Sequence, residues 1–120
     1  MLSKKNRLKK QKDFERVFKK GRGAKEDFLY LKVVKNELKS SRFGFVVSKE
    51  FSKKAVLRNR TKRRLAELIR IKLPKIKKGI DVVLVVMPEF KTRDFWEIEE
   101  IINKLSQKAK IIEQNNKINV

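Results

Sequence analysis

Apolar residues spaced three and four positions apart predict three amphipathic helices along the chain. The first covers residues 12–20 and stops at Gly21. The second covers residues 53–73 and stops at Pro74, and the third begins after Thr92, a residue type that favours the N-cap position. The apolar stripes consist of Phe14, Val17 and Phe18 in the first helix, Leu57, Thr61, Leu65 and Leu68 in the second, and Phe95, Ile98, Ile101, Ile102, Leu105, Ala109 and Ile112 in the third.

Runs of β-branched and aromatic residues predict strands at residues 28–35 ("FLYLKVVK"), 42–49 ("RFGFVVSK") and 80–87 ("IDVVLVVM"). A stretch of turn residues separates the first two runs, so they are predicted to pair as a hairpin. Gly44 inside the second run indicates a bulge or a close approach of the backbone to another group. The third run has no polar alternation, which is typical of a central strand covered on both faces.

The predicted order of elements is α-β-β-α-β-α, with a further short strand around residues 23–27 or 37–41. This order favours an α+β fold, an α-β sandwich in which helices pack on a small mixed sheet. Residues 1–120 are expected to form a single RNA-binding domain, with an extended basic arm at 1–10 and a frayed tail at 113–120.

Charge adds the strongest constraint on function. The 120 residues contain 34 Lys and Arg but only 14 Asp and Glu, a formal net charge of +20. Residues 1–25 and 49–78 together hold 24 of the 34 cations and 4 of the 14 acids. A surface charged in this way favours a polyanionic partner, and nucleic acid is the first candidate.

Missing residue types exclude several kinds of chemistry. The sequence has no Cys and no His, so disulfides, the usual zinc sites and His-assisted nucleophiles are absent. The longest apolar run, "VVLVVM", is too short to span a bilayer, and the first residues lack the apolar stretch of a signal peptide. We therefore expect a soluble cytoplasmic protein with no membrane partner and no small-molecule substrate.

The second predicted helix carries the clearest binding signal. Between Lys53 and Arg64 it has seven cations and no acid, whereas a merely solvated helix mixes charges of both signs. Leu57, Thr61, Leu65 and Leu68 fall within an arc of roughly 80° on a helical wheel, and Asn59, Arg63 and Arg70 fall on the opposite side. Arg and Lys bind phosphate and Asn reads a base edge or a 2′-hydroxyl, so this face predicts binding to a folded polynucleotide.

Aromatic residues suggest a second surface. Phe14 and Phe18 share one face of the first helix, and together with Tyr30 they are candidates for a platform on which unpaired bases stack. Ordinary core packing explains the same three rings. The late acids, which are Asp81, Glu89, Asp94, Glu97, Glu99 and Glu100, are interpreted as structural, because most of them occupy helix starts or solvent positions.

Three stretches carry a resemblance to a known family. "SKEFSKKAVLRNRTKRRLAELIR" resembles the "RNR" signature of the bacterial ribonuclease P protein component, "NRLKKQKDFERVFKKG" resembles its N-terminal segment, and "IDVVLVV" resembles its later strand. The resemblance implies an α-β sandwich with a left-handed βαβ crossover that carries the basic helix. It also implies a protein that binds a large catalytic RNA, the ribonuclease P RNA, and helps it to remove the 5′ leader from precursor tRNA. In that family the RNA and its Mg²⁺ ions carry out the cleavage, so no catalytic residue and no metal ligand is expected here.

The resemblance also distributes residues between two surfaces. Residues matched to the catalytic-RNA surface are Lys53, Lys54, Arg58, Asn59, Arg60, Lys62, Arg63, Arg64 and Arg70. Residues matched to the cleft for the leader are Arg7, Phe14, Phe18, Tyr30, Ser48 and Lys49. Ala66 stands where relatives commonly carry an Arg, which leaves an expected gap in the catalytic-RNA surface.

Two other functions remain open from the residues alone. One is a non-enzymatic RNA-binding module of the ribosomal or RNA-chaperone type. The other is a nuclease that works without an RNA subunit, through acids that the pattern does not reveal. Cleavage of precursor tRNA by a ribonuclease P RNA, with and without the protein, tests the first alternative. Cleavage by the protein alone, free of RNA, tests the second.

Overall fold

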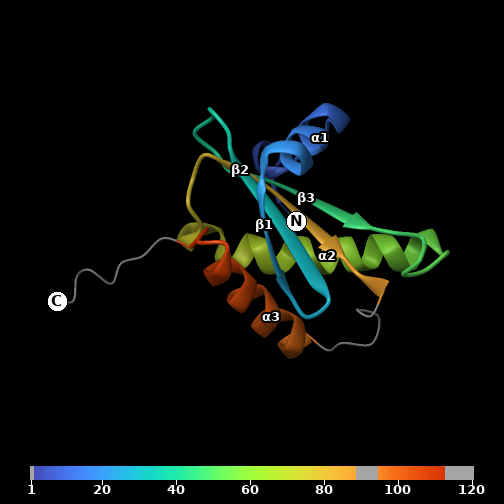
Figure 1. Cartoon of the computed structure of the whole chain (residues 1–120). Coiled ribbons are helices and arrows are strands. Elements are labelled where there is room, and N and C mark those ends of the chain that lie inside the picture. The colour runs from blue at the N-terminus through green and yellow to red at the C-terminus, as the bar shows by residue number, and fades with distance from the viewer. Residues whose placement is uncertain (1, 89–94, 113–120) are drawn as a thin grey trace.

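A four-stranded mixed sheet lies between two helical layers (Figure 1). The computed structural model describes residues 2–88 and 95–112. The elements follow in the order η1 (Lys4–Asn6), α1 (Gln11–Lys20), β1 (Arg22–Glu26), β2 (Leu29–Lys35), β3 (Arg42–Val47), α2 (Ala55–Lys72), η2 (Leu73–Lys75), β4 (Ile80–Val86) and α3 (Phe95–Lys108). Helix α1 covers one face of the sheet, and α2 and α3 cover the other. The predicted α+β sandwich is confirmed.

The strand order is β1-β2-β4-β3, so the predicted pairing of β2 with β3 is wrong. Strand β4 lies between them, antiparallel to β2 and parallel to β3. The short strand expected around residues 23–27 exists as β1, and it forms the actual hairpin with β2. The alternative at 37–41 is not a strand. Strand β4 takes the central place because its apolar side chains are buried by both helical layers.

Alternation along the strands separates two cores. Val82, Leu84 and Val86 of β4 point toward α2 and α3, whereas Val83 and Val85 point toward α1. The larger core therefore lies under α2 and α3, and a small apolar cluster lies under α1. We call the side of the sheet on which α1 lies the open face, because α1 is the one helix of the described residues that packs on it.

Residues 2–8 pack on the sheet, and the expected extended arm is not observed. Leu2 and Leu8 are buried, and Lys4–Asn6 form a single 3₁₀ turn. The Asn6 amide donates to the Ser41 carbonyl over 2.8 Å. Arg7 then forms a parallel bridge to Phe43, which covers the outer edge of β3.

The apolar stripe of α2 is shifted from the predicted one. Thr61, Leu65 and Leu68 are buried as predicted, but Leu57 is 37% exposed because contact with the core begins one turn later, at Thr61. Ala66 is buried at 8% exposure, so it does not leave a gap in an outward face. The helix stops before Pro74, as predicted.

Helix α3 buries most of the stripe that its sequence predicts; the Phe95 side chain lies outside the described residues, and Ile112 after the helix is half-buried. Ile98, Ile101, Ile102, Leu105 and Ala109 are all buried in the larger core. The expected N-cap at Thr92 and the expected frayed tail at 113–120 lie outside the described residues. None of the helices in the described ranges is long and apolar enough to cross a membrane.

Candidate nucleic-acid interface

Helix α2 presents a cationic face on the side away from the sheet. Thr61 and Leu65 lie on its buried side, where the Thr61 hydroxyl donates to the Leu57 carbonyl over 3.0 Å. The exposed members of the predicted surface on this helix are Asn59, Arg60, Arg63, Arg64 and Arg70, and we call them the cationic face. Arg58 and Lys62 flank it and are half-buried. The helix therefore has a buried apolar side and an exposed cationic side, as the helical wheel predicts.

The start of α2 adds positive potential to this face. Lys53 and Lys54 are exposed, and no acid occurs in the first turn of the helix. The Arg58 guanidinium donates to the Ser52 carbonyl over 2.8 Å, which holds the preceding turn against the helix. Unpaired backbone N–H groups at a helix start attract anions, and here the neighbouring side chains have the same sign.

Arg70 differs from the other members of the cationic face because it has an internal partner. Its Nε lies 3.1 Å from Oε1 of Glu67, one turn earlier on α2. The hydrogen bond from Arg70 lowers the pKa of the Glu67 carboxyl to about 2, and Glu67 in turn raises the pKa of Arg70. Glu67 therefore stays ionised at neutral pH and offsets the charge of Arg70.

A second candidate surface lies on the open face, beside α1. Phe18 is 39% exposed at the C-terminal end of α1, and its carbonyl accepts a hydrogen bond from Lys32 over 2.9 Å. Tyr30 and Val46 both lie opposite Val85 of β4, so one row of side chains crosses the sheet next to α1. These three side chains are half-buried. The row therefore forms an apolar floor that is open to solvent and bordered by Phe18.

The Phe14 ring lies close against β3 because Gly44 lacks a side chain. A Cβ atom added to Gly44 would be 2.4 Å from Cζ of the Phe14 ring. The close approach predicted for Gly44 is thus confirmed, and the partner is the first helix. Phe14 is half-buried against Val17 and Leu8, so it serves the small apolar cluster as well as the surface.

The other residues predicted for the cleft are distributed around this floor. Tyr30 points to the open face, and its hydroxyl lies over Gly23 on β1, where an added Cβ would be 2.6 Å away. Ser48 and the exposed Lys49 follow β3 directly, at the end of the row. Arg7 lies elsewhere, on the outer edge of β3 and beside Lys62 and Arg63 of α2.

Val46 and Val85 are floor residues that the sequence reasoning missed as part of a site. Both were read only as strand residues. Their place next to Tyr30 depends on the pairing of β4 with β2 and β3, which joins segments that are far apart in the chain. Strand alternation gives the face of each side chain, but the pairing order gives its neighbours.

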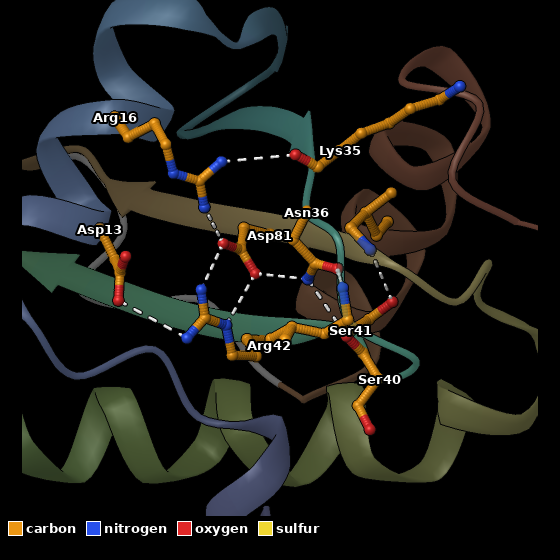
Figure 2. A network of polar contacts seen from close by, with 10 residues as sticks. Asp13, Arg16, Lys35, Asn36, Ser40, Ser41, Arg42 and Asp81 are labelled. Atoms are coloured by element: carbon orange, nitrogen blue, oxygen red, sulfur yellow. Dashed lines mark hydrogen bonds and ion pairs between the residues drawn. The ribbon is translucent and has the colours of Figure 1, made fainter.

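A buried carboxylate fixes the position of α1 on the sheet (Figure 2). Asp81 of β4 is fully buried, and both of its oxygens accept hydrogen bonds from Arg42, over 2.9 Å from Nε and 2.7 Å from Nη2. Asn36 donates to Oδ1 over 2.8 Å, and Arg16 of α1 is ion-paired with Oδ2. Asp13 of α1 lies 3.5 Å from Arg42. The Asp81 network therefore connects α1 to β3, to β4 and to the loop after β2.

These contacts keep Asp81 ionised although it is buried. Burial opposes the charged form, but the hydrogen bonds from Arg42 and Asn36 outweigh it and lower the pKa of the Asp81 carboxyl. The hydrogen bond to Asp81 likewise raises the pKa of Arg42. The network has two cations and two carboxylates in Arg16, Arg42, Asp13 and Asp81, so it adds no net charge to the surface.

The carboxylates of the described residues do not suit a metal ion. No group of three or more Asp or Glu in residues 2–88 and 95–112 lies close enough to hold one. Asp81 is already occupied by side chains of Arg16, Asn36 and Arg42.

Comparisons with known proteins show which family the chain resembles. The family model described as Ribonuclease P matches residues 2–110. The ribonuclease P protein component of Alkaliphilus metalliredigens is 38% identical over 107 residues, which cover 89% of this chain and 96% of that protein.

Solved structures give the same result. The RNase P protein of Staphylococcus aureus has a TM-score of 0.82 and 28% identity, covering 89% of this chain and 97% of that one. The RNase P protein of Thermotoga maritima has a TM-score of 0.75 and 34% identity, covering 85% and 96%. Because the family model matches almost the whole chain and a relative above 30% identity covers most of it, the chain belongs to the family of ribonuclease P protein components, the protein subunits of a ribonucleoprotein endoribonuclease.

Proposed function

We propose that this chain binds the ribonuclease P RNA through the cationic face of α2 and the 5′ leader of precursor tRNA along the open face of the sheet. The two surfaces lie on different sides of the molecule, because α2 and α1 pack on opposite faces of the same sheet. The bound protein then improves the Mg²⁺-dependent cleavage that releases the mature 5′ end of the tRNA. Family membership gives the partnership with the ribonuclease P RNA, and the roles of the two surfaces are the proposal.

One observation carries the assignment of the catalytic RNA to α2. In the described part of the chain, the cations from Lys53 to Arg64 have no ion pair with a carboxylate, although seven of them lie within twelve residues. Their mutual repulsion is relieved when phosphates lie between them. A folded RNA offers phosphates along a curved backbone, which suits an exposed helix side more than two turns long.

The open face suits a single strand better than a duplex. Its floor consists of Tyr30, Val46 and Val85, with Phe18 exposed at the border. Unpaired bases stack on such rings, and the alternative of ordinary core packing does not account for a Phe18 ring that is 39% exposed. Lys32 and Lys49 supply cations near this floor for the leader backbone.

Mg²⁺ enters the proposal as a partner of the RNA. The described carboxylates do not form a metal site, whereas phosphate oxygens of two RNA molecules are hard ligands of the kind that Mg²⁺ prefers. The cations of this chain lower the repulsion between those phosphates. The chain thus contributes affinity and positioning, and no side chain of it is assigned a catalytic role.

The decisive experiment measures precursor-tRNA cleavage by a bacterial ribonuclease P RNA at low Mg²⁺, with and without this protein. We expect stimulation by the complete protein and no cleavage by the protein alone. An RNA-binding module of the ribosomal or chaperone type would bind RNA without stimulating cleavage. Cleavage by the RNA-free protein would favour the nuclease alternative.

A second measurement tests the assignment of the open face. Phe18→Ala removes the exposed ring, so we expect weaker binding of leader-bearing precursor by the ribonucleoprotein and unchanged binding of mature tRNA. Leu38→Ala serves as the control, because Leu38 is 51% exposed in the loop after β2. An equal loss of affinity for precursor and mature tRNA would show that the leader does not bind this surface.

A further inference from the structure

A pocket of about 360 Å³ lies between the first residues of the chain and the middle of α2. Residues 7–9, the start of α1, strand β3 and helix α2 each contribute a wall. This volume is at the small end of the range of ligand sites, about 300–1,000 Å³. We call it the arm pocket; Arg7, Leu8, Phe14, Phe45, Lys62 and Ala66 are among the residues that line it.

The floor of the arm pocket is apolar and partly aromatic. Leu8, Phe43 and Ala66 are buried beneath it, and the rings of Phe14 and Phe45 are half-buried at its surface. A larger residue at position 66 would occupy this space. The shape and the chemistry suit a flat ring system of the kind that stacks on aromatic side chains.

The rim of the arm pocket is cationic. Arg7, Lys9, Lys62 and Arg63 line it, and no Asp or Glu is among the described residues that do so. An uncharged flat ligand would form no ion pair with the four cations of the rim. A ring carried on a phosphate backbone uses both the floor and the rim, and nucleotides have this combination.

Arg7 adds a specific hydrogen-bond donor. Its Nε is buried and has no hydrogen-bond partner within the described residues. A buried donor without an acceptor is unfavourable, so a ligand that brings an acceptor to this atom gains more than it would at the surface. The carbonyl oxygens and ring nitrogens of nucleobases are such acceptors.

We propose that the arm pocket receives one unstacked base of the ribonuclease P RNA. The base stacks on Phe14 and Phe45 and accepts a hydrogen bond from Nε of Arg7, while the flanking phosphates bind Lys9, Lys62 and Arg63. The catalytic RNA is favoured over the leader because Lys62 and Arg63 belong to α2, on the side away from the row of Tyr30 and Val85. This inference rests on the proposed function, and it assigns Arg7 to the catalytic RNA.

Two variants test the pocket without changing the net charge. Ala66→Leu fills the floor, and Arg7→Lys keeps the cation but removes the Nε donor. For each we expect an affinity for a bacterial ribonuclease P RNA about tenfold lower, the scale of one lost stacked base, with an unchanged dependence on salt concentration. Lys9→Ala removes a rim charge instead and should lower the salt slope by about one unit or less.

Chemical probing of the same RNA identifies the base. Dimethyl sulfate or carbodiimide should find one nucleotide that the wild-type protein protects and that becomes reactive with Ala66→Leu and Arg7→Lys. Gln107→Leu is the control, because Gln107 is exposed on α3 and lies outside both the pocket and the cationic face. It should bind and protect as the wild type does, and circular dichroism checks that each variant is folded.

The outcomes separate this inference from the proposed function. If the wild-type protein stimulates cleavage, yet both pocket variants bind and protect the RNA as it does, the inference is wrong and the proposed function stands. A loss confined to leader-bearing substrate would assign the base to the leader and also overturn the inference. A wild-type protein that neither binds the RNA nor stimulates cleavage would overturn the proposed function first.

Discussion

Replacing the buried carboxylate Asp81 by an amide should destabilise the protein by about 3 kcal/mol. Asp81→Asn keeps the shape of the side chain and one acceptor oxygen, so the contacts of Oδ1 with Asn36 and with Nε of Arg42 survive. The second oxygen becomes an NH₂ group that faces donors of Arg16 and Arg42. Two charge-assisted contacts are lost, at about 1.5–3 kcal/mol each.

The exposure of the two arginines reduces this total. Their side chains are 31% and 22% exposed, so water replaces part of the lost interaction when Asp81 loses its charge. Halving the upper sum gives about 3 kcal/mol. For a domain of this length that corresponds to a fall in melting temperature of about 12 °C, at about 4 °C per kcal/mol.

Acid should remove the difference between the two proteins. Because the folded-state pKa of Asp81 is lowered, its stabilising contribution is complete above the unfolded-state pKa of about 3.9 and is lost as the pH falls through the folded-state value. Asp81→Asn has no such contribution to lose. The other acids titrate in both proteins and cancel in the comparison.

Urea unfolding at fixed salt, followed by circular dichroism at pH 7 and at a series of lower pH values, measures both effects. Glu37→Gln is the control, since it makes the same change of charge at an exposed position and should alter the free energy of unfolding by about 0.5 kcal/mol or less. A free energy of unfolding within about 0.5 kcal/mol of the wild type at pH 7, or a difference that stays constant down to the lowest pH, would refute the role given to the Asp81 network.

Three further variants probe the surfaces and the core. Gly44→Ala should push the Phe14 ring off the sheet, lowering stability by about 1–3 kcal/mol and weakening binding of the catalytic RNA at the arm pocket. Thermal unfolding and RNA titration would detect both effects, and unchanged values would show that the close approach is not tight. Arg60→Ala should reduce the slope of log affinity for the catalytic RNA against log salt concentration by about one unit or less. Lys104→Ala on α3 should leave this slope unchanged. If the two variants have the same slope, Arg60 does not contact a phosphate of the RNA. Leu68→Ala should cost about 2–5 kcal/mol in urea unfolding, because Leu68 is 1% exposed, and a cost below about 1 kcal/mol would contradict its place in the core.

Local pattern predicted the elements of this fold because each element buries a periodic set of its own side chains. The stripe of α3 and the unbroken run of β4 are visible within a few residues of sequence, and the structure confirms both. The order of strands has no such local signal. Strand β4 enters between β2 and β3 from a segment more than thirty residues after β3, so a hairpin between neighbouring runs was the simplest reading and was wrong.

Long-range contacts also decided which site residues come together. Asp81 was interpreted as one of several structural acids, but its partners lie in α1, in β3 and in the loop after β2. The family resemblance grouped Arg7 with the leader cleft, and the first ten residues were expected to form an extended basic arm. The burial of Leu2 and Leu8 instead fixes the arm on the edge of β3, which brings Arg7 beside α2.

The positions of the acids explain why the cationic surfaces need an external partner. Asp13 and Asp81 are taken up by Arg16 and Arg42 beneath α1. The described ion pairs of α2 are Glu67 with Arg70 and Glu99 with Lys72, both at its C-terminal end.

The acids therefore neutralise the cations that hold the fold together and leave the middle of α2 and the rim of the arm pocket unneutralised. The neighbouring cations within each surface repel one another at the short distances of a helix side, so contacts among them do not stabilise the protein. Phosphates from another molecule attract these cations and so offset the repulsion. A surface of this kind is stable in solution, where water and salt screen it, but its charges become favourable once a polyanion lies against it. The same distribution of charge that keeps Asp81 inside the fold thus leaves α2 as the cationic surface that we propose for RNA binding.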